Sequence, residues 1–224
     1  MKYAINLIIL LSVVQSSFAQ SRSIGLWLTT TDQSVLLAKQ KRKLIFDKRN
    51  DELPTVAIDD SVRFQTMDGF GYTLTGGSAN VINRMSPKAK ARLIRELFGQ
   101  GKTSIGVSYL RLSIGASDLN SSAFSYNDLP AGETDPELSR FNLGEDLKEI
   151  VPLVREILRV NPRIRILGSP WSAPPWMKDN NSFIGGRLQP KYFGVYARYF
   201  VKYLTEMSRL GIRVDAITPQ NEPL

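Results

Sequence analysis

Strand-like and helix-like segments alternate in the sequence from Met67 to the last residue. Segments rich in β-branched and other apolar residues, as expected of strands, lie at 68–74, 107–114, 163–169 and 212–219. Segments with helical periodicity lie between them, at 87–98, 145–160 and 191–210. Parallel strands joined by helices through right-handed crossovers are what this order favours. The sequence therefore predicts a parallel β/α fold for residues 67–224.

Residues that begin and end helices support these boundaries. Ser86-Pro87 supplies an N-cap followed by a proline at the first helical position, and Gly99 ends that helix. Asn161-Pro162 stops the second helix, because a proline disfavours helical backbone in the residue before it. Gly211 is placed to cap the third helix.

The number of strands indicates an incomplete domain. A closed β/α barrel needs eight strands and a doubly wound sheet usually has five or more, whereas this sequence shows four and stops at Leu224, shortly after the fourth. Residues 67–224 would then be either the N-terminal half of a (β/α)8 TIM barrel or part of a doubly wound sheet. An open half barrel exposes two sheet edges and an apolar inner face. The isolated residues 20–224 are accordingly expected to self-associate or to be poorly soluble.

Residues 20–66 have a different residue pattern, which lacks helical periodicity. β-forming residues gather in short runs at 24–31, 34–37, 44–47 and 55–58. This pattern predicts a small all-β piece that precedes the β/α unit.

The first nineteen residues have the pattern of a cleaved signal peptide. Lys2 supplies a positive charge, Ala4 to Val14 is mostly apolar, and Ser17-Phe18-Ala19 offers small residues where a signal peptidase reads. The apolar run is well short of the roughly 18 residues that span a bilayer. We therefore expect cleavage after Ala19, no membrane span, and a secreted or periplasmic product.

The composition excludes several kinds of chemistry. The sequence contains no Cys and no His, so thiol nucleophiles, disulfides, thiolate metal sites and Ser-His-Asp triads are not available. Lys and Arg number 29 against 21 Asp and Glu, which gives a formal net charge of +8. The basic residues between Lys39 and Arg49 lie among apolar ones, so we interpret them as solvated strand faces and expect no nucleic-acid partner.

Polar residues follow the predicted strands, where a β/α barrel carries its catalytic side chains. Glu222 stands between Asn221 and Pro223. The proline favours an extended backbone at Glu222, and the Asn221 amide can donate a hydrogen bond to the carboxyl group. This suits a general acid, although an Asn-Glu pair alone fits a capping Glu in a surface turn equally well.

Two tryptophans follow the third predicted strand. Trp171 and Trp176 lie in a segment that contains three prolines between Ser169 and Trp176, which predicts a rigid loop. An aromatic face at a strand end is a platform on which the C–H groups of a sugar ring can stack. We favour this role for Trp171, while for Trp176 a sugar contact and core packing remain equally open.

Together, five motifs resemble glycoside hydrolase family 30, the group that includes glucosylceramidases and bacterial β-1,6-glucanases. They cover the chain from about Gln65 to its last residue, in the family's order and with similar spacing. The motifs are Asp68-Gly-Phe-Gly71, Leu110-Arg-Leu-Ser-Ile-Gly-Ala-Ser-Asp118, Gly168-Ser-Pro-Trp-Ser-Ala-Pro-Pro-Trp-Met-Lys178, Ala197-Arg-Tyr-Phe-Val-Lys-Tyr-Leu204 and Thr218-Pro-Gln-Asn-Glu-Pro223.

The resemblance implies a fold and an activity, and by it residues 67–224 are the N-terminal half of a (β/α)8 TIM barrel. Members of the family are retaining β-glycosidases built on a (β/α)8 barrel with a β-sandwich side domain, to which residues 20–66 would contribute strands. They act on β-glucosides such as glucosylceramide-like glycosides or β-1,6-glucan, and the reaction requires no metal or organic cofactor. The expected partner is thus a carbohydrate substrate.

The resemblance also implies roles for single residues. Glu222 corresponds to the family's acid/base, and Asn221 would bond the 2-hydroxyl of the sugar. Asp118 would bond distal hydroxyls, and Trp171 would close one side of the same subsite. Arg111 would support a carboxylate near the nucleophile, which is also compatible with a buried ion pair that holds strand ends together.

The sequence departs from the family pattern in two places. Glucosylceramidases tend to have Thr-Asp where this chain has Thr75-Gly76-Gly77-Ser78, a version associated with bacterial glucanase-like members, which disfavours ceramide substrates. The family's nucleophile is a Glu at the end of strand seven, and this chain has no strand seven. Retaining hydrolysis needs two carboxyl groups about 5 Å apart. Asp118 is a poor replacement, because a further strand separates it from Glu222, so the chain alone is expected to be inactive.

Two other functions remain open from the sequence. A half barrel could serve as a non-catalytic carbohydrate-binding protein, paired with itself or with a second chain. A different β/α glycosidase of the same wider clan is disfavoured, because the Ser-Pro-Trp and Gly-Phe-Gly runs are less widely shared than Asn-Glu-Pro.

Overall fold

The structure, a computed structural model, describes residues 23–45, 54, 56–57 and 59–222. The chain divides into two compact units, Met1–Phe64 and Gln65–Leu224. The predicted signal peptide lies outside the described residues, so cleavage after Ala19 stays a prediction.

The described part of the first unit contains short antiparallel strand pairs. The strands are β1 (Ser23–Ile24), β2 (Trp27–Leu28), β3 (Ala38–Lys39) and β4 (Leu44–Ile45). β1 pairs with β4, and β2 pairs with β3. The strands are shorter than the sequence predicts, and the β-sandwich to which they would belong stays a prediction.

One predicted strand of this unit, at 34–37, is wrong, because these residues form a bend before β3. Asp32 accepts hydrogen bonds from the backbone N–H and the hydroxyl of Ser34, at 3.1 and 2.8 Å. The Thr30 hydroxyl accepts a further bond from the N–H of Val35 at 3.0 Å. These local bonds satisfy the backbone in place of a strand ladder.

The predicted strands at 44–47 and 55–58 fall partly outside the described residues. The first two residues of the predicted strand at 44–47 form β4. Of the second, only Val56 and Ala57 are described, and neither lies in a strand.

The second unit is built on a four-stranded parallel sheet, as the sequence predicts. Its strands are β5 (Gly71–Leu74), β6 (Tyr109–Ile114), β7 (Arg165–Pro170) and β8 (Ala216–Ile217). They are hydrogen-bonded in chain order, and all three pairings are parallel. Among the described strands β5 and β8 are the two edges, and pairing of chains through these edges stays a prediction.

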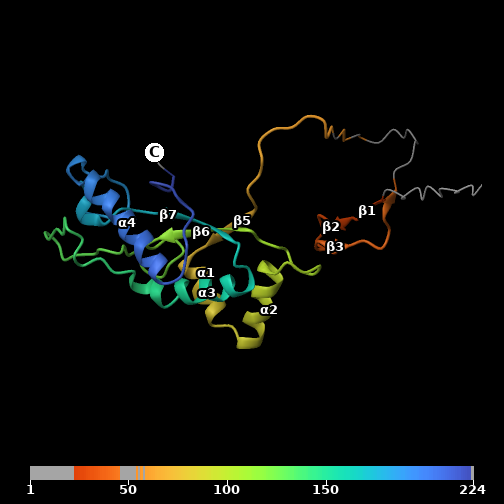
Figure 1. The fold of residues 1–224 in the computed structure, drawn as a ribbon, viewed down its shortest axis with the longest axis horizontal. Coiled ribbons are helices and arrows are strands. Elements are labelled where there is room, and N and C mark those ends of the chain that lie inside the picture. The colour runs from red at the N-terminus through yellow and green to blue at the C-terminus, as the bar shows by residue number, and fades with distance from the viewer. Residues whose placement is uncertain (1–22, 46–53, 55, 58, 223–224) are drawn as a thin grey trace, which may run out of the picture. The chain divides into compact units, whose positions relative to one another are not determined.

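Helices connect consecutive strands, and α1, α2 and α3 lie together on one side of the strands (Figure 1). The α-helices are α1 (Gly76–Asn83), α2 (Pro87–Phe98), α3 (Ile150–Val160) and α4 (Phe193–Arg209). The 3₁₀ helices are η1 (Gly144–Leu147), η2 (Pro175–Met177) and η3 (Pro190–Tyr192). In the described part of the chain, no helix combines the length and the apolar character needed to cross a membrane.

Helix α2 has the predicted boundaries and cap. The Ser86 hydroxyl accepts a hydrogen bond from the N–H of Ala89, and Pro87 opens the helix. Gly211, which follows α4, has φ = +76°, the left-handed conformation that a C-cap glycine supplies.

Helix α3 begins later than the sequence predicts. Residues 144–147 form the separate turn η1, and α3 starts only at Ile150. Pro152 lies in the first turn of α3, where the missing backbone N–H of a proline costs no helical hydrogen bond. This proline marks the true start of the helix more closely than the apolar pattern does.

The core lies between the sheet and its helices. Alternate residues of β6 point to opposite faces, and Leu110, Leu112 and Ile114 are buried on one of them. They pack with apolar residues of α3, such as Leu153 and Val154, in one continuous cluster. The residues between them on β6 face the other side, and this places Arg111 and Ser113 away from the core.

The long loop between β6 and η1, residues 115–142, is packed rather than free. Asp135 accepts hydrogen bonds from the backbone of Ser139 and Arg140 and from the Asn127 side chain. Tyr126 enters the core and stacks on Tyr199 of α4, with ring centroids 6.0 Å apart. These contacts fix the loop whose first residues carry Asp118.

A buried carboxyl group in η1 pairs with the same loop. Asp146 is 4% exposed, and it accepts a hydrogen bond from the Tyr126 hydroxyl at 2.5 Å. Burial raises the pKa of Asp146 to about 7, although the Tyr126 hydrogen bond acts in the opposite direction. Folding therefore draws a proton onto this group.

We predict that Asp146 makes the protein less stable as the pH rises from about 4, its ordinary pKa, to about 7. In this window the folded state holds more protons than the unfolded chain, so linkage lowers the free energy of unfolding with increasing pH. Asp146→Asn keeps an acceptor for Tyr126 and removes the titration. The variant should be the more stable protein at pH 8, by on the order of 1–4 kcal/mol, in urea unfolding.

A matched control is Asp60→Asn, which changes an exposed carboxylate. It should leave the pH dependence of unfolding as in the parent. A parent and an Asp146→Asn variant with the same pH dependence between 4 and 8 would contradict the assignment.

Candidate functional site

The carboxyl ends of the four parallel strands meet at one edge of the sheet. Register places Thr73 of β5 beside Arg111 of β6, and Ser113 of β6 beside Ser169 of β7. Because Arg111 and Ser113 lie on the face opposite the helix-packed core, their side chains are available to line a site. These polar side chains are flanked by the loops that follow each strand.

The Arg111 guanidinium connects three strands at this edge. Nη2 donates to Asn221 Oδ1 at 2.5 Å and to Ser169 Oγ at 3.0 Å, and Nη1 donates to Thr73 Oγ1 at 3.4 Å. The hydroxyls of Ser169 and Thr218 are themselves hydrogen-bonded, at 2.7 Å. The carboxylate partner that the resemblance implies for Arg111, near the nucleophile, stays a prediction. Within the described residues the partners of Arg111 are two hydroxyls and one amide.

A pocket of about 210 Å³ opens above this network. Four of the five predicted site residues line it, namely Arg111, Asp118, Trp171 and Asn221. The other lining residues are Thr73, Thr75, Ser113, Ser117, Leu119 and Ser169. The pocket therefore combines hydroxyls, an amide, one carboxylate, one guanidinium and one aromatic ring.

Asn221 is fixed from two directions. Its backbone N–H donates to the carbonyl of Pro170 at the end of β7, at 2.9 Å, and its Oδ1 accepts from Arg111. The remaining amide group, Nδ2, donates to Glu222 Oε2 at 3.4 Å. The predicted amide donor beside Glu222 is therefore present.

Glu222 is exposed and is not among the residues that line this pocket. Its backbone differs from the prediction, because φ is +45°, in the left-handed region rather than the extended one. The chain bends here, since Asn221 is held on Pro170 and Gln220 donates to the carbonyl oxygen of Asn221. A left-handed residue other than Gly is uncommon, and such residues cluster at functional sites.

Asp118 is positioned by a turn and by the close approach of α1 at Gly77. Asn120 Oδ1 accepts from the N–H of Ser117 at 2.9 Å, which closes the turn around Asp118. Leu119 follows Asp118 in the chain, and a Cβ at Gly77 would lie 2.1 Å from the carbonyl oxygen of Leu119. Only glycine therefore lets α1 approach this loop. The sequence gives no prediction of α1, although Thr75 caps it by accepting from the N–H of Ser78.

The two tryptophans have different environments. Trp176 is buried, donates its indole N–H to Asn127 and packs edge-on against Tyr192, so core packing is its role in the structure. Trp171 is half-buried at the pocket and stacks on Phe183, with ring centroids 6.4 Å apart and 12° between the planes. No motif or period in the sequence distinguishes Phe183 within its loop, so its contact with Trp171 is not predictable from the sequence.

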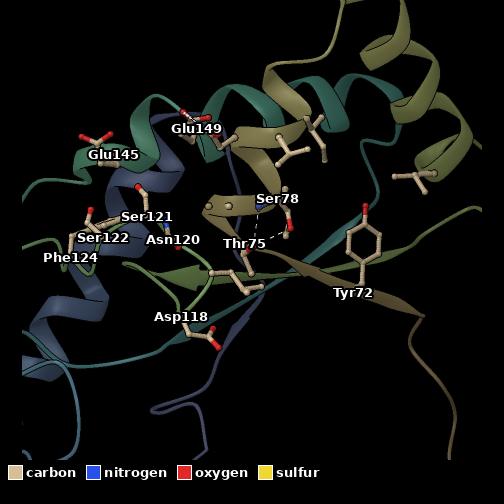
Figure 2. Close-up of a pocket in the computed structure, with 18 residues that line it drawn as sticks. Tyr72, Thr75, Ser78, Asp118, Asn120, Ser121, Ser122, Phe124, Glu145 and Glu149 are labelled. Carbon is tan, nitrogen blue, oxygen red and sulfur yellow. Dashed lines mark hydrogen bonds between the residues drawn. The ribbon is translucent and has the colours of Figure 1, made fainter.

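A second, larger pocket of about 1100 Å³ lies next to the first (Figure 2). Asp118 lines both pockets. In the larger one it lies on the side opposite Glu145 and Glu149, as Figure 2 shows. Glu149 is held by the side-chain amides of Asn80 and Asn83, at 3.0 and 2.9 Å. Within the described residues, no three acidic side chains gather as ligands for a metal ion.

Comparisons with known proteins bear on the family and the fold of the chain. The sequence model of the glycosyl hydrolase family 30 TIM-barrel domain matches residues 67–224. An endo-1,6-β-D-glucanase of Neurospora crassa is 40% identical over 178 residues, which cover 75% of this chain and 36% of that protein. The lysosomal acid glucosylceramidase of Mus musculus is 33% identical over 177 residues, which cover 75% of this chain and 33% of that protein.

A solved structure, that of the endo-β-1,6-glucanase BT3312, superimposes with a TM-score of 0.73 at 33% identity. The match covers 90% of this chain and 43% of that one. The chain therefore spans well under half the length of these relatives. The parallel β/α sheet is part of a TIM barrel, and the chain belongs to glycosyl hydrolase family 30.

Proposed function

We propose that this chain carries the acid/base half of a retaining β-glycosidase that acts on β-1,6-linked glucan. The observation that carries the proposal is the contact between Arg111 and Asn221, which fixes Asn221 beside Glu222 at the edge of a pocket shared with Asp118 and Trp171. The relatives of known activity, glucanase and glucosylceramidase, act on glucosides.

The chemistry of the pocket suits a neutral sugar. Hydroxyl groups of a glucose ring can bond the Asp118 carboxylate and the Asn221 amide, and its apolar face can lie on Trp171. Glu222 protonates the glycosidic oxygen as the bond breaks, and it later takes a proton from the water that attacks the glycosyl-enzyme. Neither step calls for a metal or an organic cofactor.

The second carboxyl group of a retaining mechanism comes, in this proposal, from a part of the protein outside these 224 residues. The chain spans 36% of the Neurospora crassa glucanase and 43% of the solved glucanase, so much of the barrel in those proteins has no counterpart here. Asp118 is the only carboxylate of the described residues that lines the smaller pocket, and it follows β6, which β7 separates from β8. We assign it to sugar binding.

We favour β-1,6-glucan over glucosylceramide as the substrate. Identity is higher to the glucanase, at 40%, than to the glucosylceramidase, at 33%. Gly76 and Gly77 also allow α1 to approach the loop that carries Asp118. By the family resemblance, this glycine pair is associated with glucanase-like members. The N-terminal pattern supports export to where such a polymer would be met.

Glu222→Gln in the full-length protein should lower kcat on β-1,6-glucan by about 10² to 10⁴, because an amide cannot protonate the leaving oxygen. For 2,4-dinitrophenyl β-D-glucoside, whose leaving group needs no proton, the step that forms the glycosyl-enzyme should lose much less. Single-turnover release of dinitrophenolate and steady-state release of reducing ends measure the two effects.

The control is Glu206→Gln, which removes an exposed carboxylate of α4 that pairs with Arg209. It should leave both rates within about twofold of the parent. Equal losses on the two substrates in Glu222→Gln would remove Glu222 as the acid. Binding of the glucan without any turnover by the parent would favour the carbohydrate-binding alternative.

Arg111→Lys should lower kcat/KM on β-1,6-glucan by about 10²-fold, since a small misplacement of positioned groups costs on that order. The lysine keeps the charge, but its compact ammonium lacks the planar fork that reaches Asn221, Ser169 and Thr73 together. Arg198→Lys is the matched control, because the Arg198 guanidinium donates to the Pro136 carbonyl and does not line the pocket. Equal kinetics in the two variants would contradict the role of Arg111.

A further inference from the structure

A hairpin-like loop, residues 178–188, follows the strand end that carries Trp171. Its base is closed by a β-bridge between Lys178 and Leu188 and by a hydrogen bond from the Asp179 N–H to the Arg187 carbonyl, at 3.0 Å. At its tip the Asn180 side chain donates to the carbonyl of Ile184 at 2.8 Å. The loop is thus internally bonded from base to tip.

Lys178 is the one buried cation of this loop. It is 9% exposed, and its ammonium donates to Ser172 Oγ at 3.1 Å and to the carbonyl oxygen of Phe183 at 3.0 Å. The ion pairs among the described residues do not include Lys178. Burial lowers the pKa of Lys178, as expected for an ammonium with neutral partners.

Both partners of Lys178 adjoin Trp171. Ser172 follows Trp171 in the chain, and Phe183 is the residue whose ring stacks on the Trp171 indole. From the other side, Gln220 Nε2 donates to the carbonyl oxygen of Trp171 at 2.8 Å. The main chain of Trp171 is therefore tied to the segment that follows β8, while Phe183 packs against its ring.

We propose that Lys178 is a positioning residue that sets the orientation of the Trp171 ring for substrate. Its ammonium holds the tip of loop 178–188 against the strand end, so that Phe183 covers one face of the indole and the pocket receives the rest of the ring. The effect on substrate rests on the function proposed above, whereas the effect on Trp171 does not.

The charge of Lys178 is what makes packing alone an insufficient explanation. A buried ammonium loses much of its hydration, and neutral acceptors return only part of that free energy. Met has a similar length and volume and would fill the same space at lower cost, but it cannot donate a hydrogen bond. What Lys178 supplies and Met would not is therefore the pair of directional bonds to the neighbours of Trp171.

The first test needs no substrate. The full-length protein is labelled with 5-fluorotryptophan, and the ¹⁹F signal of residue 171 is assigned by its loss in Trp171→Phe. Lys178→Met should shift or broaden this signal while the melting temperature stays close to that of the parent. Lys202→Met is the matched control, because Lys202 also donates to a backbone carbonyl, that of Leu138, and it does not line the pocket.

The second test separates binding from chemistry. On β-1,6-glucan, Lys178→Met should raise KM about five- to tenfold, as expected from the loss of one aromatic stacking contact, with kcat within about twofold. Phe183→Leu should have the same effect. Because both changes act through one ring, the double variant should lose little more than either single variant.

The outcomes decide between the proposal and its rivals. An unchanged residue-171 signal in Lys178→Met, or additive effects in the double variant, would overturn it. If Lys178→Met does not fold, Lys178→Gln carries the test, because its shorter, neutral side chain cannot keep both bonds to Ser172 and the Phe183 carbonyl, and the residue-171 signal must still change. If the residue-171 signal changes in Lys178→Met but the parent protein hydrolyses no β-glucoside, the proposed function is wrong and the positioning role of Lys178 still holds.

Discussion

The hydrogen bonds of Arg111 organise the strand ends of this chain. One guanidinium reaches Thr73 of β5, Ser169 of β7 and Asn221 in the segment that follows β8. A planar group with several donors in fixed directions can satisfy three such acceptors at once. Because Asn221 in turn holds Glu222, the position of the proposed acid depends on a residue two strands away.

The loops around the pocket are fixed by contacts of other kinds. Asp118 sits where it does because Gly77 lets α1 lie against the carbonyl of Leu119. Trp171 is set by Phe183 and Gln220, and the loop that carries Asp118 is continued by a segment anchored through Tyr126 in the core. Binding groups on such loops are held by the scaffold rather than by one another, which is the common arrangement in β/α enzymes.

Much of this could be predicted from the sequence, because regular elements leave local signals. The cap at Ser86, the stop at Asn161-Pro162 and the alternation of strand-like with helix-like segments predict the parallel sheet, and the motifs point to Arg111, Asp118, Trp171 and Asn221. Helix α1 was missed, since its two leading glycines have low helix propensity and serve a close approach that only the tertiary structure reveals. The left-handed backbone of Glu222 and the stacking of Phe183 likewise depend on distant contacts.

The central claim is that the pocket at the strand ends holds the sugar that is cleaved. A crystal structure of the full-length Glu222→Gln variant with a β-1,6-linked gluco-oligosaccharide tests it most directly. The account predicts a glucose ring in contact with Asp118, Trp171 and Asn221, and a glycosidic oxygen within hydrogen-bonding distance of residue 222. An oligosaccharide bound elsewhere, such as in the larger pocket beside Glu145 and Glu149, would contradict it.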